Sequence, residues 1–195
     1  MEKRGLTSSL AAAGLSANSV VGFADELRLG LRGTTRRVWG RRGVKVRQRL
    51  QLRYDWRYLV AAVDARAGTL WWGWVTSMRA ATLPPLLTWL REQGVAALVW
   101  DGAPSHRDAT VRAIGLPLIS LPPYSPELNP AERLFEEVRR HVEGRIYATL
   151  DDKAAAVDSF LGQLDTDPAR VRRLCGWNWI QTAFDTLPVG DQKAA

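Results

Sequence analysis

Three acidic residues occupy positions from which they could act together. Asp25 ends the first predicted strand, and Asp101 ends the continuous apolar run 95–100. Glu132 lies in the first turn of a helix predicted to begin at Pro130, after a stretch in which four prolines fall within nine residues. In open α/β sheets, functional sites gather beyond the carboxyl ends of strands. If the two strands are neighbours, the aspartates converge there and the stiff loop brings the glutamate onto them.

A cluster of carboxylates favours divalent cations. Two carboxylates about 4 Å apart repel each other by roughly 4 kcal/mol at an effective dielectric near 20. A divalent cation relieves this repulsion, and ligands that are all oxygen select Mg²⁺ or Mn²⁺ over zinc. A pair of such ions clamps the attacking and leaving oxygens of an in-line phosphoryl displacement. The acids therefore indicate phosphodiester chemistry with two Mg²⁺ or Mn²⁺ ions.

The same acids also have structural interpretations. Residues 129–132 form a well-made helix start, with an asparagine N-cap, a proline at the first helical position and a glutamate that completes a capping-box-like pair. Asp25 and Asp101 could be ordinary strand-end acids. Glu26 competes with Asp25, but neighbouring strand residues face opposite sides of a sheet, so only one of the two points inward. Spacing alone leaves the catalytic and structural interpretations open.

The positive charge of the chain is concentrated in one segment. Between Arg28 and Arg57 stand eleven basic residues and one acid, a net charge of +10, whereas the whole chain carries +7 and the remainder therefore −3. Such a band suits a polyanion, and ten of the eleven are arginines, which pair bidentately with phosphate. A solvated charged hairpin is the alternative. Predicted DNA-backbone contacts are Arg36, Arg37, Arg41, Arg42, Lys45 and Arg47.

The apolar patterning predicts a mixed sheet with helices on both faces. Extended segments are predicted at residues 20–25, 44–53, 57–63, 69–75, 95–100 and 117–121. Helices are predicted between Thr82 and Gly94, around 107–114, at 130–142 and 151–164, and from Pro168. Hairpin strands followed by alternating strands and helices indicate an α/β fold, with antiparallel strands 1–3 first and parallel strands after them.

The composition is that of a globular protein without a membrane span. No apolar run approaches the roughly 18 residues that a spanning helix needs. The N-terminus resembles a signal peptide only superficially, because serine and glycine dilute its apolar part. Cys175 is the single cysteine and cannot form an internal disulfide, which agrees with a reducing cytoplasm. We therefore expect a cytoplasmic protein.

Three motifs carry a resemblance to a known family. They are "FADE" (23–26), "VWDGAPSHR" (99–107) and "LPPYSPELNPAE" (121–132). Together they resemble the catalytic motifs of bacterial insertion-sequence transposases of the mariner-like DDE superfamily, closest to the insertion-sequence family numbered six-thirty. The resemblance runs from about residue 20 to 145, and the proline-rich motif with its spacing from the preceding aspartate is its most specific part.

The resemblance implies an RNase H-like catalytic fold and a role for each acid. Asp25, Asp101 and Glu132 match the family's metal-binding and catalytic triad, which uses Mg²⁺ or Mn²⁺ to cut DNA at the ends of the element and to transfer the freed strand. His106 takes the motif's usual histidine, either as a contact to DNA phosphate, as a support beside the metals, or as a structural residue. The family also implies a homodimer acting on DNA at the bacterial nucleoid.

Departures from the family pattern set the expected domain organisation. Gly102 replaces the asparagine that usually follows the second aspartate, and the interval from Asp101 to Glu132 is shorter by about one helical turn. Too few residues precede the first strand for a helix-turn-helix domain. We expect a tail at 1–19, a catalytic domain at 20–145 and a helical extension packed on it at 146–195, with a helix-turn-helix region supplied by a separate subunit or an upstream reading frame.

Three functions remain in competition. The leading hypothesis is a transposase catalytic domain acting as a Mg²⁺-dependent DNA endonuclease and strand-transfer enzyme. The second is a catalytically silent fragment that only binds DNA or a partner subunit, which Gly102 and the missing recognition domain favour. The third is another RNase H-like nuclease, acting on RNA–DNA hybrids.

Overall fold

Five strands form one mixed sheet in the order β3-β2-β1-β4-β5. The computed structural model describes residues 3–33 and 39–189. Its strands are β1 (Val21–Gly30), β2 (Trp56–Asp64), β3 (Thr69–Val75), β4 (Ala97–Trp100) and β5 (Leu118–Ser120). The first three strands are antiparallel, while β4 runs parallel to β1 and β5 runs parallel to β4. The predicted fold class, a mixed sheet with antiparallel strands followed by parallel ones, is therefore confirmed.

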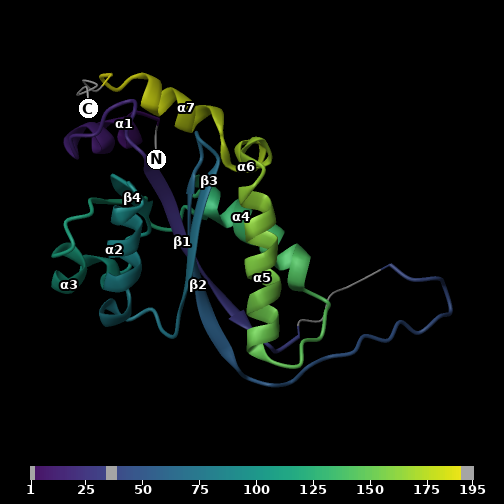
Figure 1. Ribbon diagram of the computed structural model, residues 1–195. Coiled ribbons are helices and arrows are strands. Elements are labelled where there is room, and N and C mark those ends of the chain that lie inside the picture. The colour runs from purple at the N-terminus through teal and green to yellow at the C-terminus, as the bar shows by residue number, and fades with distance from the viewer. Residues whose placement is uncertain (1–2, 34–38, 190–195) are drawn as a thin grey trace.

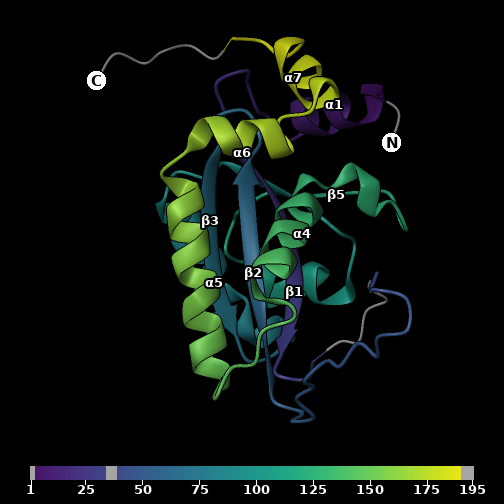
Figure 2. The ribbon, with the colours of Figure 1, turned by 90° about the vertical axis from the view of Figure 1, so that its right-hand side faces the viewer.

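Helices cover both faces of the sheet (Figure 1). On one face lie α2 (Pro84–Glu92) and α3 (Ala109–Arg112). On the other lie α4 (Pro130–Val142), α5 (Leu150–Asp165) and α6 (Pro168–Cys175). Beyond one end of the sheet, α1 (Lys3–Ala12) packs against α7 (Asn178–Asp185), as Figure 2 shows. Short 3₁₀ turns occupy Ala80–Thr82, Pro104–Arg107 and Pro126–Leu128.

The residues of α4 explain how this helix docks on the sheet. Leu134, Phe135, Val138 and Val142 are all buried and recur at helical spacing, so they form one apolar stripe. The opposite side carries arginines and glutamates that pair along the surface, such as Arg133 with Glu137. Burial of the stripe in the core shared with β1 fixes the orientation of the helix and of its first turn.

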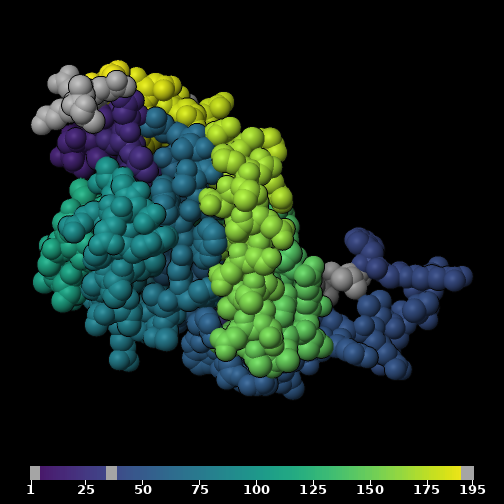
Figure 3. All heavy atoms as spheres, viewed as in Figure 1, coloured from purple at the N-terminus to yellow at the C-terminus, as the bar shows by residue number. Residues whose placement is uncertain are grey.

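The segment predicted as a strand at 44–53 is irregular, and that prediction is wrong. Residues 39–55, here called the arm, stand out from the body of the protein (Figures 1 and 3). Because β1 and β2 pair directly, from Phe23 with Val63 to Gly30 with Trp56, the arm lies outside their ladder. Its alternating apolar residues are exposed, Val46 by 52% and Leu52 by 65%, so they contribute little to the core.

The N-terminal segment, expected to be a tail, forms a helix that joins the core. Leu6 and Leu10 of α1 are completely buried, next to residues of α7 such as Ile180 and Phe184 in the same apolar cluster. The four-residue spacing of the two leucines places them on one face of the helix. Among the residues that the structure describes, no helix is both long and apolar enough to cross a membrane.

Candidate active site

The pairing of β1 with β4 brings the two aspartates to the same level of the sheet. The strands are neighbours and parallel, with Phe23 opposite Val99. Asp25 and Asp101 each stand two residues further along, so continuing this register places them opposite each other. Both have the side-chain parity of Phe23 and Val99, which face the core under α4. The two acids therefore lie near each other at the carboxyl end of β4, where both line one pocket.

Asn129 fixes the position of Glu132. Its side chain is buried, with Nδ2 donating to the carbonyl of Ala24 at 2.9 Å and Oδ1 accepting from the N–H of Ala131 at 3.1 Å. One side chain thus caps α4 and ties its first turn to β1, directly beside Asp25. The backbone N–H of Asn129 donates to the carbonyl of Pro126, which removes the capping-box explanation for Glu132. The sequence predicted the cap, but not the tie to β1.

The three acids line one pocket of about 810 Å³. The proline-rich loop forms one wall of this pocket, and the backbone after β4, including Gly102, forms another. The remaining lining residues are Ala103, Arg107, Ser120, Leu121, Pro122, Pro123, Tyr124, Ser125, Pro126 and Asn129. The structure therefore gathers Asp25, Asp101 and Glu132, far apart along the chain, around a single cavity.

The electrostatics of Asp25 show that negative charge accumulates in this pocket. Burial, together with the charges of Glu132, Glu26 and Asp101, raises its pKa from the ordinary value of 3.8 to about 7. The N–H of Glu26, which donates to Asp25 Oδ1 at 2.8 Å, offsets only part of this. A carboxyl in this setting gains stability when a proton or a metal cation arrives.

His106 is turned inward against Asp101. The imidazole is only 4% exposed, its Nδ1 lies 2.8 Å from Asp101 Oδ1, and its ring stacks on Trp100 with centroids 3.9 Å apart. The hydrogen bond from His106 lowers the pKa of Asp101. Burial works to lower the pKa of His106, but its hydrogen bonds to Asp101 outweigh burial and raise it. The contact thus favours the charged form of both groups, and burial of the imidazole leaves little surface for the predicted phosphate contact.

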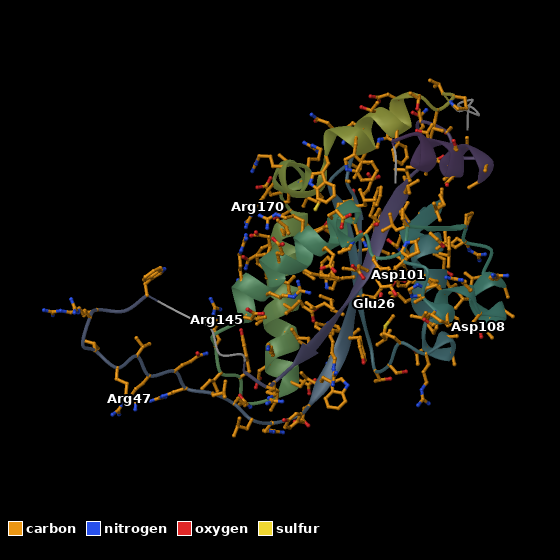
Figure 4. The ribbon with its side chains drawn as sticks, turned by 180° about the vertical axis from the view of Figure 1, so that it is seen from behind. Glu26, Arg47, Asp101, Asp108, Arg145 and Arg170 are labelled. Carbon is orange, nitrogen blue, oxygen red and sulfur yellow. The ribbon has the colours of Figure 1, made fainter. Side chains whose placement is uncertain are left out.

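Glu26 lies on the opposite face of β1 and joins the support of this pair. Trp100 Nε1 donates to Glu26 Oε2 at 3.0 Å, so the indole bridges from Glu26 to the imidazole of His106 that stacks on it. Burial raises the pKa of Glu26. The alternation argument correctly separated Glu26 from Asp25, but no local signal pointed to Trp100 as a bridge. Figure 4 shows Glu26 and Asp101 close to each other in the middle of the fold.

The three carboxylates are suitable ligands for a hard cation, although their oxygens do not converge on one point. Three carboxylates supply oxygen alone, as Mg²⁺ and Mn²⁺ require. As placed, Asp101 faces His106, and Glu132 Oε2 lies 3.7 Å from Arg139 Nη1. Within residues 3–33 and 39–189, no three His, Cys, Asp or Glu side chains form a group that could hold a metal ion. The residues fit the ion by chemistry and by their common pocket.

The basic residues predicted to bind DNA that the structure describes on the arm lie apart from this pocket. Arg36 and Arg37 fall outside the described residues. The other four, Arg41, Arg42, Lys45 and Arg47, are exposed on the arm. Figure 4 shows Arg47 far out on the arm, well away from Asp101. The structure therefore offers a basic projection and an acidic pocket as separate features.

Comparison with known proteins identifies the fold. The family described as DDE superfamily endonuclease matches residues 20–152. The Mos1 mariner paired-end complex with Mg has a TM-score of 0.60 at 15% identity, covering 98% of this chain and 65% of that chain. The catalytic domain of Mos1 mariner transposase has a TM-score of 0.56 at 12% identity, covering 95% of each chain.

These likenesses confirm the RNase H-like fold class and extend no further by themselves, because the identities are low. The chain spans less than two thirds of the longer Mos1 chains, for example 61% of the one in the paired-end complex with left transposon end, which has a TM-score of 0.59 at 14% identity and covers 88% of this chain. No curated protein sequence matches the chain.

Proposed function

Because the chain belongs to the DDE superfamily of endonucleases, we propose that it is the catalytic domain of a DNA transposase that cleaves DNA and transfers the freed strand. The observation that carries this proposal is the β1–β4 register, which sets Asp25 level with Asp101 beside the pocket that Glu132 also lines. The family description alone names an endonuclease, and the transposition step draws on the likeness in fold to the Mos1 transposase.

In this proposal Asp25, Asp101 and Glu132 hold two Mg²⁺ or Mn²⁺ ions. The ions would activate water, and later a 3′-hydroxyl, for in-line attack on a phosphodiester. The fold supplies the rest of the site: Asn129 sets the distance of α4 from β1, and His106 fixes the rotamer of Asp101. Mos1 complexes that share the fold contain Mg or Mn, which supports a divalent ion here.

The arm supplies the electrostatic grip on DNA. Its arginines and lysine are exposed. Because arginine pairs bidentately with phosphate, we expect the arm to contact the phosphate backbone of either DNA strand. The proposal also includes what the resemblance of the motifs implies. These further parts are a bacterial origin, membership in the six-thirty family, a homodimer and a separate helix-turn-helix subunit. Action on chromosomal DNA would bring the protein to the nucleoid.

A silent DNA-binding fragment is the second candidate, and two observations favour it. Gly102 puts no polar side chain beside the pocket. Among the described residues, the oxygens of the three acids do not converge into a group that could hold a metal ion. This candidate predicts DNA binding through the arm without metal-dependent cutting.

Nicking of a supercoiled plasmid decides between the two. We expect the wild type to nick DNA with Mg²⁺ or Mn²⁺ and to stop when EDTA is added. Asp101→Asn should lose about 100-fold or more in rate, because even residues that only support metal ligands cost 10- to 100-fold. Asp108→Asn is the matched control, since Asp108 caps α3 outside the pocket.

Equal nicking by the wild type and Asp101→Asn would remove the proposed role of Asp101. DNA binding without nicking in either metal would support the silent fragment. Preferential cleavage of RNA–DNA hybrid would instead indicate a different RNase H-like nuclease.

A further inference from the structure

Tyr124 combines an unusual backbone conformation with an exposed side chain, and core packing explains neither. It lies in the turn of the proline-rich loop with a φ of 56°, and it is the one non-glycine residue with positive φ among those that the structure describes. Its side chain is 99% exposed. Glycine or asparagine adopts this backbone region more readily than a bulky residue. The exposed ring gains no stabilisation from burial. Neither backbone preference nor core packing therefore accounts for a tyrosine here.

The position of Tyr124 links it to the acidic pocket. It lines the same cavity as Asp25, Asp101 and Glu132. Pro122 and Pro123 before it and Pro126 after it restrict the loop, because proline fixes its own φ and limits the residue that precedes it. The backbone that carries the ring is therefore restricted beside the acids.

The pocket also has room and charge for a nucleotide. About 810 Å³ is far more than metal ions occupy. Arg107 lines the wall near the acids, and its guanidinium donates to the carbonyl of Gly102. A cation at the wall suits a phosphate, and an exposed ring suits the flat face of a base. An aromatic ring beside a phosphate site matches one nucleotide of a DNA strand.

We propose that Tyr124 is a base-stacking residue. Its ring stacks on a nucleobase that is splayed out of the duplex next to the phosphate that is cut. This inference rests on the proposed function, because the DNA substrate comes from it. Every base has a π face, so stacking tolerates any sequence and positions the strand without reading it. A tyrosine has only two side-chain torsions to fix, so the contact costs little conformational entropy.

The test uses forked DNA that carries 2-aminopurine at the junction, with Ca²⁺ in place of Mg²⁺ during binding. Tyr124→Phe keeps the ring, while Tyr124→Asn removes it and suits the positive φ. Trp89→Gln is the control, because Trp89 is a partly exposed aromatic on α2, on the other face of the sheet. We expect the wild type, Tyr124→Phe and Trp89→Gln to quench the 2-aminopurine alike and to prefer forked DNA over duplex.

Tyr124→Asn should abolish the quenching and weaken binding of forked DNA by about 5- to 150-fold, the range that removal of one stacking aromatic gives. Its melting temperature should equal or exceed that of the wild type, and Tyr124→Gly should behave in the same way, which separates loss of stacking from misfolding.

Unchanged quenching and affinity in Tyr124→Asn overturn the inference. If DNA binding is unchanged but light scattering shows altered self-association, the ring contacts a second copy of the chain, and the inference is again wrong. Metal-dependent nicking by the wild type, run in parallel, keeps the two proposals apart: nicking without a Tyr124 effect refutes the stacking alone. No binding of forked DNA and no nicking by the wild type refute both.

Discussion

Replacement of Asp25 by asparagine should stabilise the metal-free protein at alkaline pH. Burial and the neighbouring carboxylates raise the pKa of Asp25 from 3.8 to about 7 in the folded state. Between these two values the folded chain binds more protons at this site than the unfolded chain. The free energy of unfolding therefore falls as pH rises through this window. The stabilising contribution is complete below pH 3.8 and lost above about pH 7.

The size of the effect follows from the shift. A change of about 3 pH units at 1.36 kcal/mol per unit is about 4 kcal/mol. The amide introduced by Asp25→Asn does not titrate, yet its oxygen can still accept from the N–H of Glu26. The stability difference between Asp25→Asn and the wild type should thus grow by about 4 kcal/mol from pH 3 to pH 8. At this chain length that corresponds to roughly 8–16 °C in melting temperature.

The assay is urea unfolding in EDTA at several pH values, with Glu92→Gln as the control because Glu92 is exposed on α2. Addition of Mg²⁺ at pH 8 should stabilise the wild type and Glu92→Gln more than Asp25→Asn, since bound ligand stabilises the folded state. Parallel stability curves for Asp25→Asn and the wild type from pH 4 to pH 8 would show that Asp25 titrates normally. The account of the pocket as an accumulation of uncompensated charge would then be wrong.

Substitutions at two further positions probe the residues that position the acids. Asn129→Ala should lower stability by about 2–4 kcal/mol, because it removes the helix cap and leaves the carbonyl of Ala24 without its donor. Urea unfolding measures this, and wild-type stability of Asn129→Ser, which keeps the cap but loses the donor to Ala24, would rule out the tie to β1. His106→Phe, which keeps a ring on Trp100 but loses the donor to Asp101, should weaken Mn²⁺ binding by about 10- to 100-fold, whereas His106→Asn should weaken it less. Isothermal titration calorimetry tests the latter pair, and equal Mn²⁺ affinity in both variants and the wild type would leave His106 a structural residue.

The arm and the N-terminal helix show where local pattern misled the prediction of elements. Residues 44–53 largely alternate apolar and polar side chains, as a half-buried strand does. The backbone has no ladder to join, because β1 and β2 pair with each other from Phe23 with Val63 to Gly30 with Trp56. A strand is stabilised by pairing with a neighbouring strand, and alternating side chains do not show whether such a neighbour exists. Residues 3–12 are dilute in apolar side chains, but Leu6 and Leu10 suffice to bury one face against α7.

By itself the sequence indicated most of the helices and strands outside the arm and the terminal helices α1 and α7, and it showed that Asp25, Asp101 and Glu132 stand near element ends. These features are local, because periodicity and capping act within a few residues. Only the tertiary structure decided that β4 pairs with β1 so that Phe23 lies opposite Val99, and that Asn129 reaches the carbonyl of Ala24. Strand order and register depend on contacts between residues far apart along the chain, which burial of the whole core selects and no short pattern encodes.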